Sequence, residues 1–449
     1  MVKYVMATLL LCVGLGAYAG GEPSRLYAGT AKVDITPGRT VISTGESFRL
    51  PDKIAPGEKT PPDNVHDPLY ARVIVLKNKD VSLAVVSVDL ILFSSKRVID
   101  EAKKQWGLEH VILSSTHNHS GMMPRGLSPT GRGQAWSFAQ EDPGVSLDWP
   151  GFSEDPWYAE TEKKIVAAIG AAMANRFPAR IVAGKGPYDS VYLGHNRRYV
   201  NPNGRVTMMW DNPKRIPNGP QDPTIGVIRI EDQAGKPRVL LVHYACHAVT
   251  MMGDRRITAD FPGAMADYIE GELGESCMAM FLQGAEGDQD PYEMRLRGTY
   301  GFNMIKQSGV SLAKAALRVA KDLPSPGNPE VSLRIEETTV KIPYRKADKA
   351  SEACVMTIVI NDELALVTIP GEPFIQHQLN LSERSPVPNT FMLGVAYCGR
   401  GSPFLIYIPT IQAVKEGGYG ASECSYVSAD AGDRMVNAAV ASIKELLAR

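Results

Sequence analysis

The sequence predicts a mixed α/β fold that contains both parallel and antiparallel strands. Short apolar runs rich in Val, Leu and Ile alternate along the chain with segments of helical periodicity. One strand–helix–strand succession indicates a parallel pair, and two pairs of apolar runs joined by short turns indicate hairpins. The 449 residues are 44% hydrophobic and 22% charged, which is typical of a globular chain with a large core.

The first predicted unit is the strand–helix–strand succession. Residues 81–93 form a nearly continuous apolar run, which is typical of a strand buried on both faces. Ser94-Ser95 is suited to begin a helix, because a serine hydroxyl accepts hydrogen bonds from the first helical turn. A second short strand is expected at 111–113. The apolar face of the intervening helix consists of Val98, Ala102 and Trp106.

The remaining elements follow from the same two periodicities. They are a helix after Pro156 that carries Ile165, Ile169 and Met173, a hairpin of strands 227–230 and 239–242, a helix at 265–273, a strand at 278–282, a helix at 310–323, a hairpin of strands 355–360 and 364–369, and a closing helix at 436–447.

Charge and targeting signals limit the class of protein. With 48 basic and 49 acidic residues, the chain lacks the basic excess of a nucleic-acid binder. Lys3, an apolar stretch at 6–15 and Ala17-Tyr18-Ala19 together predict a secretory signal peptide over residues 1–19. Residues 20–449 are therefore expected to be a secreted or periplasmic soluble protein.

The cysteines do not form the pattern of a disulfide scaffold or of a cysteine zinc site. Outside the predicted signal peptide the chain keeps Cys246, Cys277, Cys354, Cys398 and Cys424, and no C-x-x-C pair occurs. An odd number of cysteines in an oxidising compartment leaves at least one thiol free.

Two histidine pairs follow predicted strands. His117 and His119 are two residues apart, and side chains at i and i+2 of an extended chain point the same way. His243 and His247 are likewise in phase at the end of a strand. Because imidazole is a common zinc ligand, the two pairs predict a metal site. The alternative is that one member of each pair is a core histidine, and we expect this of His243.

Several other polar residues remain ambiguous from the sequence. Glu372 follows a strand and could be a metal ligand or a helix N-terminal acid. Asn196-Arg197-Arg198 could bind an anion or form a solvated charge pair, and the two acids of 287–291 could include a general base or cap a turn. Asp89, within an apolar run, needs a structural partner.

Two long loops are predicted, at 44–68 and 122–158. The second could be an ordered lid or stacking surface, or a loop packed on its own domain. Its aromatic residues are Trp136, Phe138, Trp149, Phe152, Trp157 and Tyr158.

The ordered set of motifs resembles the neutral/alkaline, non-lysosomal ceramidase family over nearly all of residues 20–449. The matching segments are AGTAKVDITP at 28–37, DPLYAR at 67–72, THNHSG at 116–121, Asn196-Arg197, His247, GDQDP at 287–291, PGE at 370–372, Tyr407-Ile408-Pro409-Thr410 and Tyr419.

The resemblance implies the catalytic domain of that family, with mixed β-sheet layers and helices packed on the outside. It implies a zinc ion bound by four residues, namely His117, His247, Glu372 and Tyr407. It also implies that three residues line the active site and stabilise the oxyanion, namely His119, Arg197 and Tyr419.

The chain departs from the family pattern in two places. Asp290 stands where the family has its nucleophilic serine. A carboxylate at this position could act as general base toward a zinc-activated water, join the metal site, or mark a loss of activity. The second departure is that the family's C-terminal immunoglobulin-like domain is missing, so residues 20–449 are expected to form a single catalytic domain.

The leading hypothesis is a secreted zinc hydrolase that cleaves an amide (N-acyl) bond of a lipid, with transient contact with a membrane surface. A second hypothesis keeps zinc but changes the substrate to a glycan, an N-acylated sugar or an ester. A third is a metal-binding pseudoenzyme. The sequence leaves the oligomeric state open.

Overall fold

The computed structural model describes residues 25–37, 65–121, 156–254, 256–274, 276–325, 331–346, 348–399 and 404–449, and the backbone of 48–49 and 123–124. The predicted signal peptide and most of the two predicted long loops lie outside these residues. β2 (Phe48–Arg49) and β6 (Met123–Pro124), one from each loop, pair with each other.

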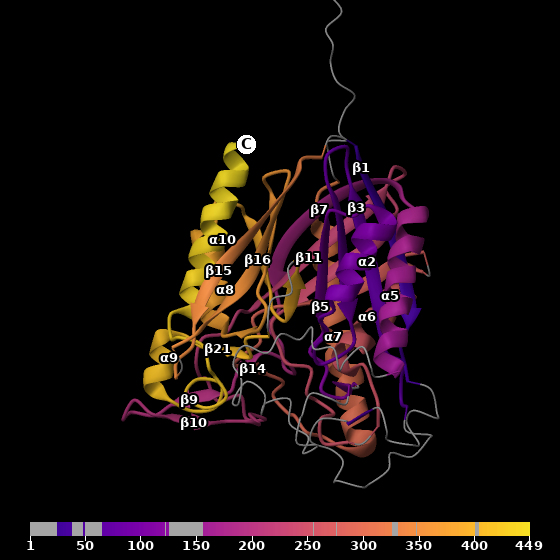
Figure 1. Ribbon diagram of the computed structural model, residues 1–449. Helices are drawn as coiled ribbons and strands as arrows, with labels where there is room; N and C mark the ends of the chain where they lie inside the picture. The colour runs from indigo at the N-terminus through magenta and orange to yellow at the C-terminus, as the bar shows by residue number, and fades with distance from the viewer. Residues whose placement is uncertain are drawn as a thin grey trace, which may run out of the picture.

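Two β-sheets packed face to face form the centre of the molecule (Figure 1). The larger sheet has nine strands in the spatial order β13 (Met278–Gln283), β12 (Pro237–Tyr244), β11 (Thr224–Asp232), β7 (Phe177–Pro187), β1 (Leu26–Asp34), β3 (Tyr70–Lys77), β4 (Ser82–Val88), β5 (His110–Ser115) and β20 (Ala396–Cys398). The smaller sheet has four strands in the order β15 (Leu333–Pro343), β16 (Ala350–Ile360), β17 (Leu364–Thr368) and β19 (Asn389–Leu393).

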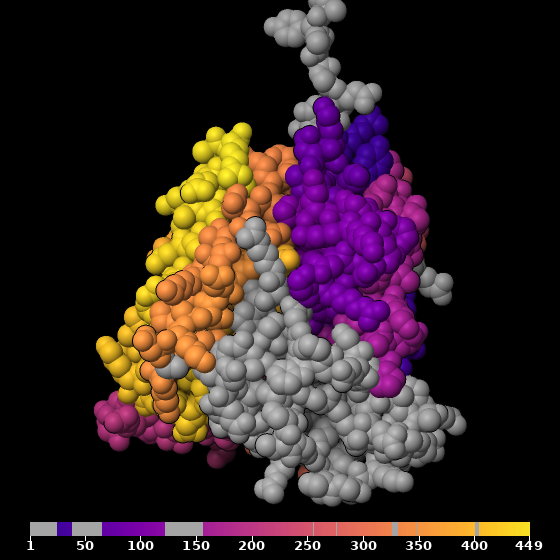
Figure 2. All heavy atoms as spheres, in the orientation of Figure 1, coloured from indigo at the N-terminus to yellow at the C-terminus, as the bar shows by residue number. Residues whose placement is uncertain are grey.

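Helices cover the outer face of each sheet. The nine-stranded sheet carries α2 (Lys96–Trp106), α5 (Pro156–Ala174), α6 (Asp260–Leu273) and α7 (Gly298–Asp322). The four-stranded sheet carries α8 (Ile375–Arg384) and α10 (Ala431–Ala448). Figure 2 shows the two halves side by side, the C-terminal one in orange and yellow. The predicted fold of β-sheet layers with helices outside is thus confirmed.

The strands of the large sheet are apolar on both faces because each face is buried. In β4, Val86 and Val88 pack toward α2 and α5, whereas Val85 packs toward the smaller sheet. This period of two is hidden in the sequence, since every position of β4 is apolar or small.

The strand predicted at 81–93 is shorter than expected. β4 ends at Val88, and the chain then turns away from the sheet while its side chains stay in the core. The turn begins at Asp89, whose carboxylate accepts hydrogen bonds from Arg72 Nη1 at 2.7 Å and the Tyr70 amide at 2.9 Å. The structural partner predicted for Asp89 is therefore Arg72. An apolar run in the sequence indicates that the segment is buried, but it does not indicate the residue at which the strand ends.

The other predicted elements are present, with shifted ends. β4 and β5 are parallel with α2 between them, and the Ser95 hydroxyl accepts from the Val98 amide at 3.1 Å at the start of that helix. Both predicted hairpins occur, β11 with β12 and β16 with β17. The helix predicted at 310–323 starts earlier, at Gly298. Trp157 and Tyr158 belong to α5 and are buried, so they pack on their own domain.

Two of the cysteines meet between the sheets. Cys354 of β16 and Cys398 of β20 place their sulfurs 2.7 Å apart, and both side chains are buried. No disulfide links cysteines in the described part of the chain. Among the described residues, no helix combines the length and the apolar character required to traverse a bilayer.

The fold gathers several strand ends at one edge of the molecule. β4 and β5 run parallel to each other, as do β12 and β13. The two pairs converge where the Ser87 hydroxyl donates to the Phe281 carbonyl at 2.8 Å. Beyond these ends, the loop after β5 joins the loop after β12 through the His119 amide, which donates to the Ala248 carbonyl at 3.0 Å. The Asn118 amide also donates to the Leu90 carbonyl after β4 at 3.1 Å, and the His247 amide donates to the Gln289 carbonyl after β13 at 2.9 Å, so loops from four strands meet at one place.

Candidate metal centre

The loops at this edge bring two imidazoles and a carboxylate into contact. They come from His117 after β5, His247 after β12, and Glu372 in β18 (Glu372–Pro373). Glu372 Oε2 lies 3.4 Å from His117 Nε2 and 3.2 Å from His247 Nε2, and all three side chains are buried. Ligand atoms about 2.0–2.1 Å from a tetrahedral zinc are roughly 3.3 Å from each other. The spacing of these three atoms therefore fits a shared cation.

The hydrogen bonds of the two imidazoles decide which nitrogen faces the carboxylate. The Nδ1–H of His117 donates to the Ile91 carbonyl at 2.6 Å, and the Nδ1–H of His247 donates to the Gln289 carbonyl at 3.1 Å. A neutral imidazole that donates through Nδ1 has a lone pair on Nε2. Two lone pairs and a carboxylate oxygen therefore face one another with no hydrogen between them, an arrangement that a cation would stabilise.

The conformation of His117 differs from the extended one predicted. β5 ends at Ser115, and His117 has φ of 56°, in the left-handed region that few non-glycine residues adopt. His117 and His119 do lie together, with their Nε2 atoms 3.3 Å apart, but a turn brings them there rather than the alternation of a strand.

His119 lies among the potential ligand atoms. One ring nitrogen from each of His117, His119 and His247 lies within 4.8 Å of the other two. His119 Nδ1 is buried and has no hydrogen-bond partner in the described part of the chain. Burial, together with the neighbouring imidazoles, lowers the pKa of His119 well below its usual range. His119, to which the resemblance assigns the oxyanion, therefore also lies where it could serve as a metal ligand.

Burial and neighbouring groups set the charges of His247 and Glu372. Burial lowers the pKa of His247, which favours the neutral, metal-binding form. Burial by itself would raise the pKa of Glu372, but positive charge and hydrogen-bond donation from the side of His117 and His247 hold it well below its usual range, and a cation bound between the three groups would act in the same direction. Gly287 is required nearby, because a Cβ there would lie 2.4 Å from the Glu372 carbonyl oxygen.

Tyr407 lies beside Glu372 because β18 pairs in parallel with β21 (Tyr407–Ile408), and the two residues are register partners. The Tyr407 ring centroid is 6.4 Å from that of His247. Burial, with a contribution from Glu372, raises the pKa of Tyr407 well above its usual value. Without a cation, the hydroxyl is therefore a neutral phenol.

Arg197 and Asp290 form a buried ion pair next to His247. Arg197 precedes β9 (Arg198–Val200), and Asp290 lies in β14 (Gln289–Asp290), which pairs with β8 (His195–Asn196). Arg197 Nη1 is 3.2 Å from Asp290 Oδ1, and Arg197 Nη2 donates to the Gly287 carbonyl at 2.7 Å. Asp290 Oδ1 also lies 3.5 Å from His247 Nδ1. Asp290 thus contacts the imidazole at the nitrogen remote from Glu372.

The interpretation of the two arginines as a solvated charge pair is wrong. Both side chains are almost wholly buried. Arg198 donates to the Gly417 carbonyl at 2.9 Å, at the end of α9 (Ile411–Glu416), so its role is structural. Burial tends to lower the pKa of Arg197, but Asp290 and the nearby tyrosines raise it, so the guanidinium stays charged. Arg197 is the member of the pair that faces the metal-centre residues.

The acids of the loop 287–291 divide into two roles. Asp288 accepts hydrogen bonds from the Ile375 amide at 2.9 Å and from Asn196 Nδ2 at 2.8 Å, so it holds the loop in place. Asp290 instead pairs with Arg197 and lies behind His247, at Nδ1. His243 is buried on the other side of its strand and donates to the Met392 carbonyl at 2.7 Å, which confirms it as a core histidine.

Aromatic rings surround Arg197. The guanidinium carbon lies 5.2 Å from the ring centroid of Tyr407, 5.3 Å from that of Tyr419 and 5.4 Å from that of Trp210. A hydrogen bond links Tyr419 to Tyr407. Figure 1 shows β14, β21, β9 and β10 (Val206–Met208) together at this lower end of the molecule.

Three further residues of this region are not found by the sequence reasoning. They are Trp210, Tyr397 and Glu286. Glu286 contributes to a second group of possible ligands, in which one atom each of His117, Glu286 and Glu372 lies within 4.8 Å of the others. The signal that could have found Glu286 is its position in a glycine-rich loop directly after a strand.

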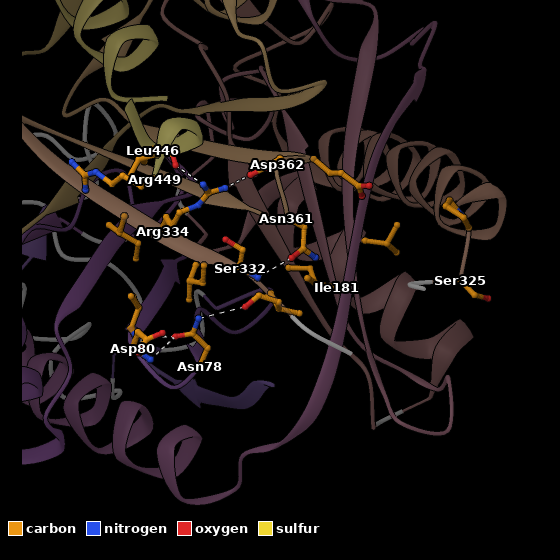
Figure 3. A pocket seen from close by; sticks show the side chains of 17 residues that line it. Asn78, Asp80, Ile181, Ser325, Ser332, Arg334, Asn361, Asp362, Leu446 and Arg449 are labelled. Carbon is orange, nitrogen blue, oxygen red and sulfur yellow. Dashed lines mark hydrogen bonds and ion pairs between the residues drawn. The ribbon is translucent and has the colours of Figure 1, made fainter. Parts of the chain in front are cut away.

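A pocket of about 970 Å³ lies elsewhere and includes none of these residues. Figure 3 shows its lining, which comes from the β3–β4 turn, β7, the segment after α7, the start of β15, the β16–β17 turn and the end of α10. Since β4 begins at that turn and runs toward the metal-centre residues, the pocket lies at the opposite edge of the sheets. Arg334 within it pairs with Asp362 and the Leu446 carbonyl. Arg449, the second arginine of the lining, pairs with Glu336 at 2.8 Å, so both arginines are engaged by the protein itself.

The overall fold is similar to that of solved ceramidases. The neutral ceramidase from Pseudomonas aeruginosa matches with a TM-score of 0.67 and 17% identity, over 94% of this chain and 75% of that one. A ceramidase complexed with C2 matches with a TM-score of 0.68 and 17% identity, over 94% and 76% of the two chains. At this identity the likeness establishes the fold, which is the fold that the motif resemblance implied. No protein-family model matches the chain, and no curated protein sequence does.

Proposed function

We propose that this protein is a zinc-dependent hydrolase that cleaves an amide (N-acyl) bond with water as the nucleophile. The observation that carries the proposal is the buried meeting of His117 Nε2, His247 Nε2 and Glu372 Oε2 at 3.2 and 3.4 Å. A cation between lone pairs at this spacing would stabilise them. Tyr407, the register partner of Glu372, is the proposed fourth ligand.

The donor set fits zinc, which binds imidazole nitrogen and carboxylate oxygen at short distances. When bound, zinc would act as a Lewis acid that lowers the pKa of a water molecule and polarises a carbonyl group. The carbonyl groups of Ile91 and Gln289 orient the two histidines from behind, at 2.6 and 3.1 Å. A hydrogen bond from one ring nitrogen of a histidine determines that the other nitrogen is the one available to a metal.

The residues around the proposed ligands have complementary roles. Asp290 is the proposed general base, which accepts a proton from the attacking water. Arg197, His119 and Tyr419 are proposed to bind the oxyanion that develops on the substrate carbonyl. Arg197 is held by the Asp290 carboxylate at 3.2 Å and the Gly287 carbonyl at 2.7 Å, so its charge needs little reorganisation during the reaction.

A lipid amide is the proposed substrate, and the solved structures of similar fold are named as ceramidases. We also propose that the protein is exported and that it meets its substrate at a membrane surface. N-terminal sequencing of the protein from the medium or periplasm of expressing cells tests the export. A start at residue 20 is expected, and an intact Met1 in exported protein would refute cleavage after Ala19.

The test of the activity is hydrolysis of a short-chain ceramide by the zinc-loaded protein, measured as release of sphingosine. Asp290→Asn should abolish turnover and leave zinc bound, whereas Glu372→Ala should remove zinc and activity together. Asp232→Asn is the matched control, because Asp232 ends β11 at the remote turn into β12 and its carboxylate accepts hydrogen bonds from two backbone amides at 3.0 and 3.1 Å. Full activity of metal-free protein would refute the proposal. Zinc binding without turnover would support the pseudoenzyme.

A specific observation favours a second candidate substrate, an N-acylated sugar. Trp210 lies 5.2 Å from the Tyr419 ring centroid and has Arg197 on one side and Arg295, at 5.0 Å, on another. Flat aromatic rings beside polar donors suit a sugar ring as well as a lipid. Release of acetate or a longer acid from N-acylated glucosamine, with no release from ceramide, would select this candidate.

A further inference from the structure

We propose that Glu286 is an anionic ligand in the metal centre, so that a divalent first-row cation is held by two carboxylates, Glu286 and Glu372, together with His117. This inference rests on the proposed metal dependence and adds to it a residue that neither the motifs nor the fold likeness assigns.

The position of Glu286 is unusual for an acidic residue. It lies in the loop between β13 and β14, and its side chain has no solvent exposure. Apart from the residue's own backbone amide, no donor in the described part of the chain reaches either carboxylate oxygen. An ionised carboxylate buried in this way destabilises a protein by several kcal/mol unless a cation or a set of donors compensates it.

The neighbours of Glu286 are other ligand atoms without partners. One oxygen of Glu286 lies within 4.8 Å of a His117 nitrogen and of a Glu372 oxygen. Glu372 Oε2 faces the two imidazoles, but its Oε1 is buried and accepts no hydrogen bond among the described residues. The hydroxyl of Tyr397, whose charge interactions are with Glu372 and Glu286, is buried and equally unpartnered. Unsatisfied atoms thus gather on the Glu286 side of Glu372.

A cation explains these atoms better than a proton does. A protonated Glu286 would carry a hydroxyl to donate, yet no acceptor from the described residues pairs with it. Oxygens bound to one divalent cation at about 2.1–2.3 Å lie no more than roughly 4.2–4.6 Å apart, and the ligand oxygens of Glu286 and Glu372 lie within 4.8 Å of each other.

The backbone around Glu286 supports the same conclusion. The Glu286 carboxylate packs directly against the backbone of Gly394. No side chain fits at that position, because a Cβ there would lie 2.5 Å from Glu286 Oε2 and 2.4 Å from the Gly284 carbonyl oxygen. The turn is held by the Gln289 amide, which donates to the Glu286 carbonyl at 2.7 Å. The side chain is therefore held in place by its loop and not by contacts of its own carboxylate.

The experiment measures metal binding by the full chain, stripped with a chelator and titrated with zinc or manganese(II) against a competing chromophoric chelator. Glu286→Gln keeps the shape of the side chain and removes its charge. We expect it to weaken metal affinity by at least tenfold. Glu231→Gln is the matched control, since Glu231 is also buried but pairs with Arg229 at 2.7 Å, near the end of β11. The control should keep the affinity of the original protein.

A second readout does not depend on affinity. Cobalt(II) loaded into the protein reports the number of its ligands through its visible spectrum, and Glu286→Gln should change that spectrum while Glu231→Gln should not. If Glu286→Gln fails to fold, Glu286→Asp keeps the charge and shortens the reach, and its cobalt spectrum should also differ from that of the original protein.

The outcomes separate this inference from the proposed function. Equal affinity and an unchanged cobalt spectrum in Glu286→Gln would overturn the inference and leave the hydrolase proposal standing. A weakened affinity would support the inference even if no amide is cleaved. If the original protein binds neither zinc nor manganese, both proposals fail.

Discussion

The buried pair of Arg197 and Asp290 gives a prediction whose size can be worked out from the structure. The side chains are 4% and 0% exposed, and their charged atoms are 3.2 Å apart. At an effective dielectric constant of about 20, two unit charges at this distance attract by about 5 kcal/mol. Removing one partner of such a pair leaves the other charge buried and unpaired, which typically costs about 3–5 kcal/mol.

The perturbation is a double-mutant cycle. Asp290→Asn keeps an oxygen that can still accept from Arg197, so we expect the free energy of unfolding to fall by about 3 kcal/mol. Among the described residues, Arg197→Met leaves the Asp290 carboxylate with His247 Nδ1, at 3.5 Å, as its one ion-pair neighbour, and should cost about 4 kcal/mol. The double variant holds no unpaired charge, so its loss should be smaller than the sum of the two by about 2 kcal/mol or more.

The assay is urea unfolding followed by circular dichroism, with chelator present so that metal binding does not contribute. The slope of the free energy against urea should be the same in all four proteins. The reasoning would be refuted if the loss of the double variant equalled the sum of the two single losses within about 0.5 kcal/mol. It would also be refuted if Asp290→Asn lost less than about 1 kcal/mol. Either result would mean that Asp290 and Arg197 do not act as a buried ion pair.

Three further predictions follow from other parts of the structure. Burial lowers the pKa of His243 to about 4, so the unfolded chain takes up a proton below about pH 6.5 before the folded one does. Stability should therefore fall between pH 6.5 and pH 4, by about 3 kcal/mol more than in His243→Gln; equal pH dependence of urea unfolding in the two proteins would contradict this. Gly287→Ala would place a Cβ 2.4 Å from the Glu372 carbonyl oxygen, so calorimetric melting should show a loss of about 2 kcal/mol, and metal titration a clear loss of affinity. An unchanged melting temperature would show that the loop can yield there. Treatment with oxidised glutathione should remove two hydrogens from Cys354 and Cys398, whose sulfurs are 2.7 Å apart, and join β16 to β20. Peptide mass spectrometry without reduction checks this, and complete alkylation of both thiols after oxidation would contradict it.

Much of the fold follows from local periodicity. β4, α2 and β5 are recognisable because an apolar run, a serine cap and a second apolar run succeed one another, and each signal acts within a few residues. Their ends are less predictable. β4 stops at Val88 because Asp89 turns to meet Arg72, a partner from a neighbouring strand that local sequence does not reveal.

The candidate site shows the same division. The sequence could mark His117, His247 and Glu372 as chemically capable residues that follow strands, and the resemblance could group them. The left-handed turn at His117, the ion pair between Arg197 and Asp290, and the unpartnered carboxylate of Glu286 depend on contacts between distant loops.

By itself, then, the sequence determined the class of fold and the kinds of side chain available for chemistry, because periodicity and residue type are local properties. Only the tertiary structure decided which atoms face one another. Glu372 Oε2 meets the two Nε2 atoms because the loops after β5, β12 and β17 meet at one edge, and the carbonyl groups of Ile91 and Gln289 occupy the opposite nitrogens. The direction of a lone pair is set by such hydrogen bonds across the fold, and no run of neighbouring residues encodes it.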